Sequence, residues 1–259
     1  MSVLEYQFGQ LDEVLEPYNF GAFVDGGSGG DPSFANVTAL LHFEGADGAT
    51  AFTDVKGHTV TRIGLSTLET TDPLWGVSSM KNPDINSGCV ISHDDMRLLT
   101  GEWTIEGWFT LDVIPPLNPG EGYGILAQVG ASLADATAVT IFASENFDPI
   151  EGFGSISVDL PGSSSLNSDD NAIQVGVKTH IAVTKNASNV CKLWIQGVEI
   201  DDTINANAPT NVGAKFSVGC WADASPDSGT IGRFDEWRLT PGVCRYTAPF
   251  TPEAPYPDA

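Results

Sequence analysis

The sequence has few basic residues: Lys and Arg together number 11, against 34 Asp and Glu, and the formal net charge is −23. A surface with this charge repels phosphate backbones, and no cluster of Lys or Arg is present to offset the repulsion. We therefore expect no nucleic-acid partner. A solvated, soluble surface explains the excess of acids, with cation binding or repulsive spacing in an assembly as the alternatives.

Long apolar runs and closely spaced cysteines are also missing. No stretch approaches the roughly 18 consecutive apolar residues of a membrane span, so we expect none. The first residues, MSVLEYQFGQLDEVLEPY, lack the basic and then apolar order of a signal peptide. No two cysteines form a C-x-x-C motif. We expect reduced thiols at all four cysteines, which are Cys89, Cys191, Cys220 and Cys244.

Motifs for zinc binding and nucleophilic catalysis are missing too. No H-x-x-x-H spacing occurs among the four histidines, which are His42, His58, His93 and His180, and this argues against a zinc site. The one local His/Asp cluster is SHDDM at residues 92–96, and a turn with a helix-capping Ser or Asp explains it without a metal. No G-x-S-x-G is present, and we interpret DLPGSSSLNSDD as a polar loop.

Short apolar runs rich in β-branched and aromatic residues are what the sequence does contain. From residue 37 onward these runs are separated by Gly, Pro, Asn and Asp, with 28 Gly and 16 Pro in all. In GEWTIEGWFTLD, alternate residues are apolar, which predicts a strand with one face in the core. KNASN predicts a hairpin loop, and IQGV predicts a tight turn at Gly197. Because helical crossovers are absent, we predict an all-β, antiparallel two-sheet sandwich.

Residues 1–35 differ from the rest and predict an extended N-terminal arm. The composition of DGGSGGDP is typical of a flexible linker, and acids and aromatic residues precede it. We expect this arm to dock on its own domain, on a sister copy or on another protein. The assembly contacts expected of the arm come from its aromatic residues, which are Tyr6, Phe8, Tyr18, Phe20 and Phe23. Residues 36–259 then form the sandwich and a Pro-rich C-terminal tail.

Four segments in the right order resemble one known family. ALLHFEGADGATAFTDVKGHTVT resembles the opening of concanavalin A-like, LamG-type jelly-roll domains, and WTIEGWFTLD resembles their central strand. HIAVTKNASNVCKLWIQGVEI is similar to their paired strands. GTIGRFDEWRLTPGVCRYTAPFTPEAPYP resembles the closing strand and tail in the version often carried by tailed-phage virion proteins. The resemblance covers roughly residues 37–257, and its motifs indicate the fold more than the activity.

The closing strand carries an acid that needs a partner. By strand alternation Asp235 lies on the same side as Trp237 and Leu239, where an unpaired carboxylate costs several kcal/mol. Backbone amides or an arginine such as Arg233 provide one solution. The resemblance implies another, a structural calcium ion held by Glu44 and Asp235 with nearby carbonyl oxygens.

Catalysis and sugar binding call for different residues. The related glucanases use a Glu-x-Asp-x-x-Glu strand, but the nearest match, Glu199 and Asp201, has Ile204 at the third acid position. We therefore expect no enzyme. A lectin needs an exposed aromatic ring, for which Trp108 and Trp194 are candidates because they fall on the polar faces of their strands; burial in the sandwich is the alternative.

The resemblance implies a non-enzymatic structural or accessory virion protein of a tailed phage, assembled in the bacterial host cytoplasm. In this interpretation the arm attaches to capsid or tail proteins and to copies of the same chain. The sandwich then faces outward, as a capsid decoration or a tail-associated module, and could bind host glycans. The alternatives are a carbohydrate-binding module or lectin and, less favoured, a glucanase-type hydrolase.

Overall fold

The computed structural model describes residues 30–115, 123–132, 134–145, 153–209, 213–225 and 229–259. The chain divides into two units, Met1–Gly30 and Asp31–Ala259. The second unit begins before the predicted boundary between residues 35 and 36. Within the described residues the helical elements are two short 3-10 helices, η1 (Phe34–Asn36) and η2 (Asp94–Met96), and every other regular element is a strand. The predicted all-β class is confirmed.

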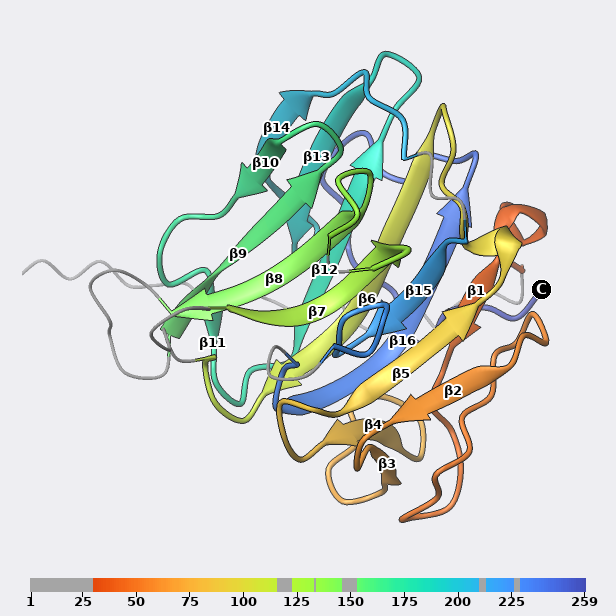
Figure 1. The fold of residues 1–259 in the computed structure, drawn as a ribbon. Coiled ribbons are helices and arrows are strands. Elements are labelled where there is room, and N and C mark those ends of the chain that lie inside the picture. Colours follow the sequence, from red (N-terminus) through yellow and green to blue (C-terminus); the bar gives the residue numbers. More distant parts are fainter. Residues whose placement is uncertain (1–29, 116–122, 133, 146–152, 210–212, 226–228) are drawn as a thin grey trace, which may run out of the picture. The chain divides into compact units, whose positions relative to one another are not determined.

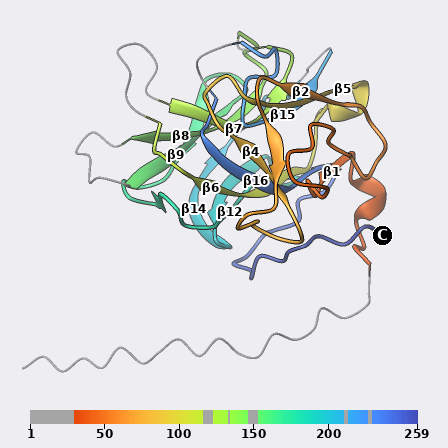
Figure 2. The same cartoon turned by 90° about the horizontal axis from the view of Figure 1, so that it is seen from below.

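The strands form two antiparallel sheets that face each other across one core, as Figures 1 and 2 show from two directions. Sheet 1 has the strand order β14 (Val198–Ile204), β13 (Val190–Ile195), β12 (Thr179–Lys185), β6 (Trp103–Leu111), β16 (Gly232–Pro241), β4 (Ser79–Asn82) and β3 (Thr67–Glu69), and β1 (Ala39–Leu41) pairs with β16. From β4 to β7 consecutive strands alternate between the sheets, as expected of a sandwich.

The second layer of the sandwich is sheet 2. Sheet 2 has the strand order β10 (Ser164–Asn167), β9 (Phe153–Leu160), β8 (Val139–Glu145), β7 (Tyr123–Gly130), β15 (Lys215–Val218), β5 (Gly88–Ser92) and β2 (Val60–Ile63), and β11 (Ile173–Gln174) pairs with β9. The predicted two-sheet sandwich is confirmed. No helix among the described residues has the length and apolar character needed to cross a bilayer.

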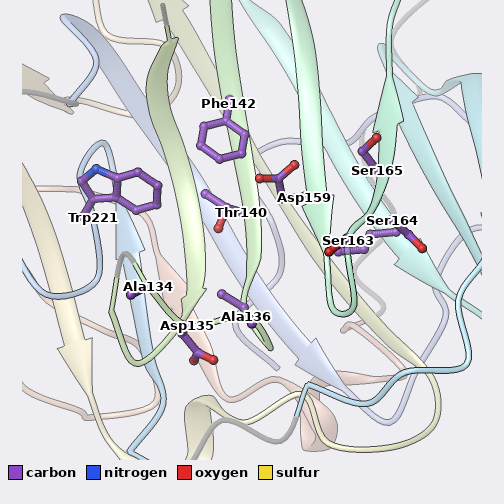
Figure 3. A pocket seen from close by; sticks show the side chains of 12 residues that line it. Ala134, Asp135, Ala136, Thr140, Phe142, Asp159, Ser163, Ser164, Ser165 and Trp221 are labelled. Carbon is purple, nitrogen blue, oxygen red and sulfur yellow. The ribbon is translucent and has the colours of Figure 1, made fainter. Parts of the chain in front are cut away.

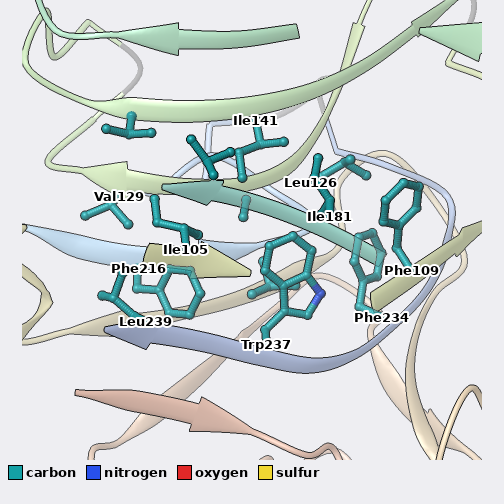
Figure 4. Close-up of a cluster of buried hydrophobic side chains, with 14 of the residues drawn as sticks. Ile105, Phe109, Leu126, Val129, Ile141, Ile181, Phe216, Phe234, Trp237 and Leu239 are labelled. Carbon is teal, nitrogen blue, oxygen red and sulfur yellow. The ribbon is translucent and has the colours of Figure 1, made fainter. Parts of the chain in front are cut away.

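The core lies between the sheets and includes the predicted apolar face of β6. Side chains from both layers meet there in Figure 4, where the labelled residues are Ile105, Phe109, Leu126, Val129, Ile141, Ile181, Phe216, Phe234, Trp237 and Leu239. Gly107 occupies this face because the Trp237 ring crosses it: a Cβ on Gly107 would lie 2.3 Å from that ring. All four cysteines are free thiols, and three of them are buried.

A β-bulge in β16 overturns the predicted facing of Asp235. The register between β16 and β6 shifts between Asp235 and Arg238, so alternation does not continue through this segment. Asp235 lies opposite Trp108, while Leu239 lies opposite Ile105 in the core. Asp235 therefore points to the outer face of sheet 1, away from the core side that carries Leu239.

The predicted turns between β12, β13 and β14 are confirmed. Asn186 in the KNASN loop accepts hydrogen bonds from the N–H groups of Ser188 and Val190 at 2.9 and 3.0 Å. Gln196 and Gly197 join β13 to β14 with φ of 51° and 75°. Two positive φ values are what a tight two-residue hairpin requires.

The two ends of the sandwich unit meet. The N–H of Asp31 donates a hydrogen bond to the carbonyl oxygen of Ala259 at 2.5 Å. The Asp31 carboxylate is also buried, and it accepts hydrogen bonds from Arg238 of β16 at 3.2 Å and from Arg245 at 2.7 Å. The first residue of the unit is thus bound both to the last residue and to sheet 1.

Candidate functional site

The two acids predicted to hold calcium both bind the loop at residues 74–79. Asp235 is fully buried and accepts hydrogen bonds from the N–H of Trp75 at 3.0 Å and the hydroxyl of Ser79 at 2.8 Å. Burial raises the pKa of Asp235 to about 8. Glu44 is exposed and accepts from the N–H of Val77 at 3.0 Å. Protein donors thus partner both carboxylates, and calcium binding stays a prediction from the sequence.

Arg233 is not the partner of Asp235. Its guanidinium donates to Glu69 at 2.8 Å and lies 3.6 Å from Asp112. Asp235 instead accepts a third hydrogen bond from the N–H of Glu236 at 3.0 Å. Of the alternatives weighed for Asp235, the one with backbone amides matches these contacts.

Trp108 and Trp194 are buried, which corrects their assignment as an exposed platform for sugars. Both point to the outer face of sheet 1, as predicted, but the C-terminal segment (residues 242–259) covers that face. Trp108 is 7% exposed and donates its indole N–H to the carbonyl of Glu253 at 3.3 Å. Trp194 is 0% exposed, with its ring centroid 5.7 Å from that of Phe250. Neither ring offers a face to a ligand.

Beneath the same segment lies a buried charge network centred on Glu106. Arg238 donates to Glu106 at 2.9 Å, and the hydroxyl of Tyr246 donates to Glu106 at 2.6 Å. The Tyr256 hydroxyl lies 2.9 Å from Nε2 of His180. Burial alone would raise the pKa of Glu106, but the charge of Arg238 outweighs it and lowers the pKa to about 2. The network binds the tail and is closed to solvent.

The acids closest to a glucanase pattern lie at one edge of sheet 1. Glu199 and Asp201 belong to β14, which is the edge strand of sheet 1. Glu199 accepts from the ammonium group of Lys192 at 2.7 Å, and Asp201 accepts from the N–H of Asn167 at 2.9 Å. The two acids thus serve surface contacts, in agreement with the missing third acid.

The outer face of sheet 2 carries a pocket of about 450 Å³, which we call the outer pocket (Figure 3). Strands β8 and β9, the loop before β8 and the turn between β9 and β10 form its walls. Its lining residues are Ala134, Asp135, Ala136, Ala138, Thr140, Phe142, Asp159, Leu160, Ser163, Ser164, Ser165 and Trp221. In Figure 3, Trp221 and the three serines lie on opposite sides of Phe142, Thr140 and Asp159.

Packed aromatic rings form one side of the outer pocket. The ring centroids of Phe142 and Trp221 lie 5.9 Å apart at an interplanar angle of 76°. Tyr123 contacts both rings edge to face, at 4.8 and 6.2 Å. Because Phe142 and Trp221 are 7% and 3% exposed, only the edges of these rings reach the pocket. The rings pack against one another and, like Trp108, offer no exposed face on which a sugar could stack.

Polar groups of the outer pocket point toward its interior with unused hydrogen-bonding capacity. The amide N–H of Gln128 donates to the hydroxyl of Thr140 at 3.0 Å, which leaves the hydroxyl proton of Thr140 free to donate. Asp159 is exposed, no residue of the described chain donates to its carboxylate, and partial burial raises its pKa. Ser163 in the turn after β9 and Ser165, which lies opposite Asp159 in the β9–β10 register, also line the pocket.

The second acid of the pocket, Asp135, already accepts hydrogen bonds at both of its carboxylate oxygens. One oxygen accepts from the N–H of Ala131 at 2.8 Å, and the other accepts from the N–H and hydroxyl of Thr137 at 2.9 and 2.7 Å. Burial would raise the pKa of Asp135, but these hydrogen bonds outweigh it and lower the pKa. Asp135 therefore holds its loop in shape, and Asp159 is the carboxylate that a ligand can reach.

Little in the sequence indicates the outer pocket, since its residues come from separate segments. The prediction of a polar loop for DLPGSSSLNSDD is wrong in part, because Ser164–Asn167 form β10, and nothing in these residues shows that they line a pocket with Trp221. Trp221 itself lies beside a turn, as its neighbours Gly219 and Asp223 suggest. The five predicted assembly aromatics, Tyr6, Phe8, Tyr18, Phe20 and Phe23, lie outside the described residues.

Known structures share this fold at low sequence identity. Domain 4 of AbnA, a GH43 extracellular arabinanase from Geobacillus stearothermophilus, solved in complex with arabinotriose, is 16% identical with a TM-score of 0.52; the match covers 81% of this chain and 94% of that one. The binding domain of Paraclostridial Mosquitocidal Protein 1 is 13% identical with a TM-score of 0.54 over 80% of this chain and 49% of that one.

A third neighbour is the binding domain of botulinum neurotoxin DC in complex with SialylT, at 14% identity and a TM-score of 0.53 over 80% of this chain and 48% of that one. This chain thus spans about half the length of the toxin binding domains it matches. No protein-family model and no curated protein matches the sequence. At these identities the likeness establishes an all-β sandwich and nothing more.

Proposed function

We propose that this chain is a non-enzymatic glycan-binding domain whose ligand site is the outer pocket. The observation that carries the proposal is the pocket itself, in which the unpartnered carboxylate of Asp159 and the hydroxyl of Thr140 lie beside the edges of buried aromatic rings. Sugars present many hydroxyl donors, which a free carboxylate and protein hydroxyls can bind and orient. A volume of about 450 Å³ is in the range of small-molecule sites.

The neighbours supply independent support for a binding role. The arabinanase domain was solved with arabinotriose, and the neurotoxin binding domain was solved with SialylT. This chain carries a comparable sandwich, and its outer pocket lies on an open sheet face. The neighbours support the fold only. The proposed ligand class rests on the chemistry of this chain's own pocket.

The same pocket argues against glycoside hydrolysis. Hydrolysis by the usual mechanism needs two carboxylates that flank the scissile bond, one of them free to take or give a proton. Asp159 meets that requirement, but both oxygens of Asp135 accept hydrogen bonds from its own loop. One free acid can orient a sugar hydroxyl, and it cannot by itself supply both roles.

A glycan array followed by calorimetry tests the proposal. We expect one glycan class to bind, with an affinity that falls at least about 10-fold in Asp159→Ala, because a charged hydrogen bond is worth about 1.5–3 kcal/mol. Ser165→Ala, which removes a hydroxyl opposite Asp159, should weaken binding less. Asp202→Ala, which removes an exposed acid from β14, is the matched control and should leave affinity unchanged. Equal affinity in the Asp159 variant and the control would place the ligand elsewhere.

A place on a phage particle is a second proposal, supported by the sequence resemblance alone. It depends on the arm at residues 1–35, which would join capsid or tail proteins or copies of the chain. Deleting residues 1–30 should leave the sandwich folded, because the second unit starts at Asp31, but should abolish incorporation into particles. A truncated chain that still incorporates contradicts the role of the arm and leaves the glycan proposal unaffected.

A further inference from the structure

Two histidines far apart in sequence meet at one end of the β2–β5 pair. Val60 of β2 lies opposite Ile91 of β5 in antiparallel register. Two residues beyond each of these positions, the same register sets residue 58 opposite residue 93. His58 and His93 accordingly lie with ring centroids 4.5 Å apart. The short helix η2 follows at once and adds Asp95 to the pair.

The three side chains have the spacing of metal ligands. Nε2 of His58 lies 3.2 Å from Oδ2 of Asp95, and Nδ1 of His93 lies 3.3 Å from the same oxygen. All three ligand atoms are within 4.8 Å of one another. Two ligands at about 2.0–2.1 Å from a tetrahedral zinc ion are about 3.4 Å apart, so small side-chain shifts would close a site here.

Asp54 fixes the orientation of His58. Its buried carboxylate accepts from the N–H of Leu40 at 2.8 Å and from the N–H of His58 at 3.1 Å, and it lies 2.7 Å from Nδ1 of His58. A neutral imidazole carries one N–H, which this contact places on Nδ1. Metal-ligating histidines are held by carboxylates in this way, with the other nitrogen toward the metal.

The contact between His58 and Asp95 brings two potential metal-ligand atoms together. With its proton on Nδ1, His58 presents the lone pair of Nε2 to the carboxylate of Asp95, and two acceptors at 3.2 Å repel each other. A metal ion coordinated by both atoms would remove this repulsion. Arg97 does not fill this role, because it pairs with Asp94 at 2.9 Å.

We propose that His58, His93 and Asp95 bind a divalent transition-metal ion of the class to which zinc belongs. Two imidazoles and one carboxylate suit zinc, nickel or copper, whereas calcium and magnesium take oxygen ligands. The His93 and Asp95 side chains are 51% and 55% exposed, so water can complete the coordination. His93 now accepts from the N–H of Asp95 at 3.2 Å and would release that bond to the solvent on binding. The ion would join the loop before β2 to η2.

Titration of the chelator-treated full chain with zinc chloride tests the proposal. About 100 mM sodium chloride in the buffer screens non-specific attraction to the acidic surface. We expect saturation at one ion per chain and a rise in Tm with zinc concentration, because a ligand bound to the folded state stabilises it. Calcium chloride at the same concentrations should not compete.

Variants locate the ion. His58→Gln and His93→Gln should each weaken zinc binding at least about 10-fold. Asp54→Asn should weaken it about 10–100-fold, because Asp54 no longer holds the His58 ring in the orientation that the metal needs. Asp94→Asn, in the same helical turn, removes an acid that is not a ligand and is the matched control. If Asp54→Asn fails to fold, the two histidine variants still decide, because neither imidazole is part of the core.

Nitrogen chemical shifts of His58 distinguish a metal from a proton. In the proposed site, zinc shifts the resonance of Nε2 while Nδ1 keeps its proton. A resonance for Nε2 that remains that of a protonated nitrogen in excess zinc would overturn the proposal. The proposal would also be wrong if the double variant His58→Gln/His93→Gln bound zinc as tightly as the native chain, or if calcium displaced zinc.

Discussion

The outer faces of the two sheets differ in whether another part of the chain covers them. On sheet 1, the C-terminal segment covers Trp108 and Trp194 and seals the charge network around Glu106. On sheet 2, no described segment covers the outer pocket, and the carboxylate of Asp159 stays open to solvent. Both faces combine aromatic rings with acids. What separates a structural surface from a binding surface is whether another part of the chain lies on it.

The covered face is expected to control stability. Removing the carboxylate in Glu106→Ala leaves the guanidinium of Arg238 buried without its main partner, with an expected loss of about 3–5 kcal/mol in the free energy of unfolding. Urea denaturation measures this loss. Glu199→Ala breaks an ion pair with Lys192 at the surface and should cost at most about 1 kcal/mol. Equal losses would mean that the network does not differ from a surface ion pair.

Loosening the cover should expose sheet 1 without unfolding the sandwich. Phe250 lies against Trp194 and stacks on Tyr246 at a centroid distance of 3.5 Å. We expect Phe250→Ala to lower the free energy of unfolding by about 1–3 kcal/mol, since the ring is partly buried. Quenching of tryptophan fluorescence by acrylamide should increase. Unchanged quenching would show that the segment stays in place without this ring.

The cover should also respond to pH through His42. Burial disfavours the charged imidazole, but hydrogen bonds and charges from Glu236 and Asp258 outweigh this and raise the pKa to about 9, from an ordinary 6.5. A raised histidine pKa stabilises the folded state below pH 6.5, and this stabilisation is lost as pH rises through 9. His42→Gln should therefore flatten the fall in stability between these values, by about 1 kcal/mol after solvent screening. Urea denaturation at both ends of this pH range measures the change.

The smallest effect is expected on the open face. Partial burial raises the pKa of Asp159, so its contribution to stability falls as pH rises above the ordinary value for Asp. Asp159→Asn removes that fall and should raise the free energy of unfolding at about pH 7 by less than about 1 kcal/mol. Denaturation at about pH 7 and about pH 4 checks the sign. A marked loss instead would make Asp159 part of the scaffold.

The strand pattern was enough to predict the sandwich and much of its core. Alternation in β6 assigned Ile105 and Phe109 correctly to the buried face, because side chains on one strand point in turn to opposite sides. The turn at Gly197 was also predictable, since glycine tolerates the positive φ found there. Both features are local, and neighbouring residues contain the information that specifies them.

Features that depend on distant segments were not predictable in the same way. Glu236 adopts φ of 51° in the bulge of β16, and the residue type does not predict this conformation. Trp108 is buried beneath the tail, where it donates a hydrogen bond to Glu253, 145 residues later in the chain. His58 and His93 are brought together by strand register, so a search for closely spaced histidines misses them.

The hydrogen bond between Asp31 and Ala259 has a practical consequence for handling the domain. A unit whose first and last residues touch is nearly a ring, and a short glycine linker could join them. New ends could then be opened at the exposed tip of the β12–β13 hairpin, near Ser188. Such a circularly permuted protein would keep both sheets intact and would move any fused partner or surface attachment away from the place where the chain now enters and leaves.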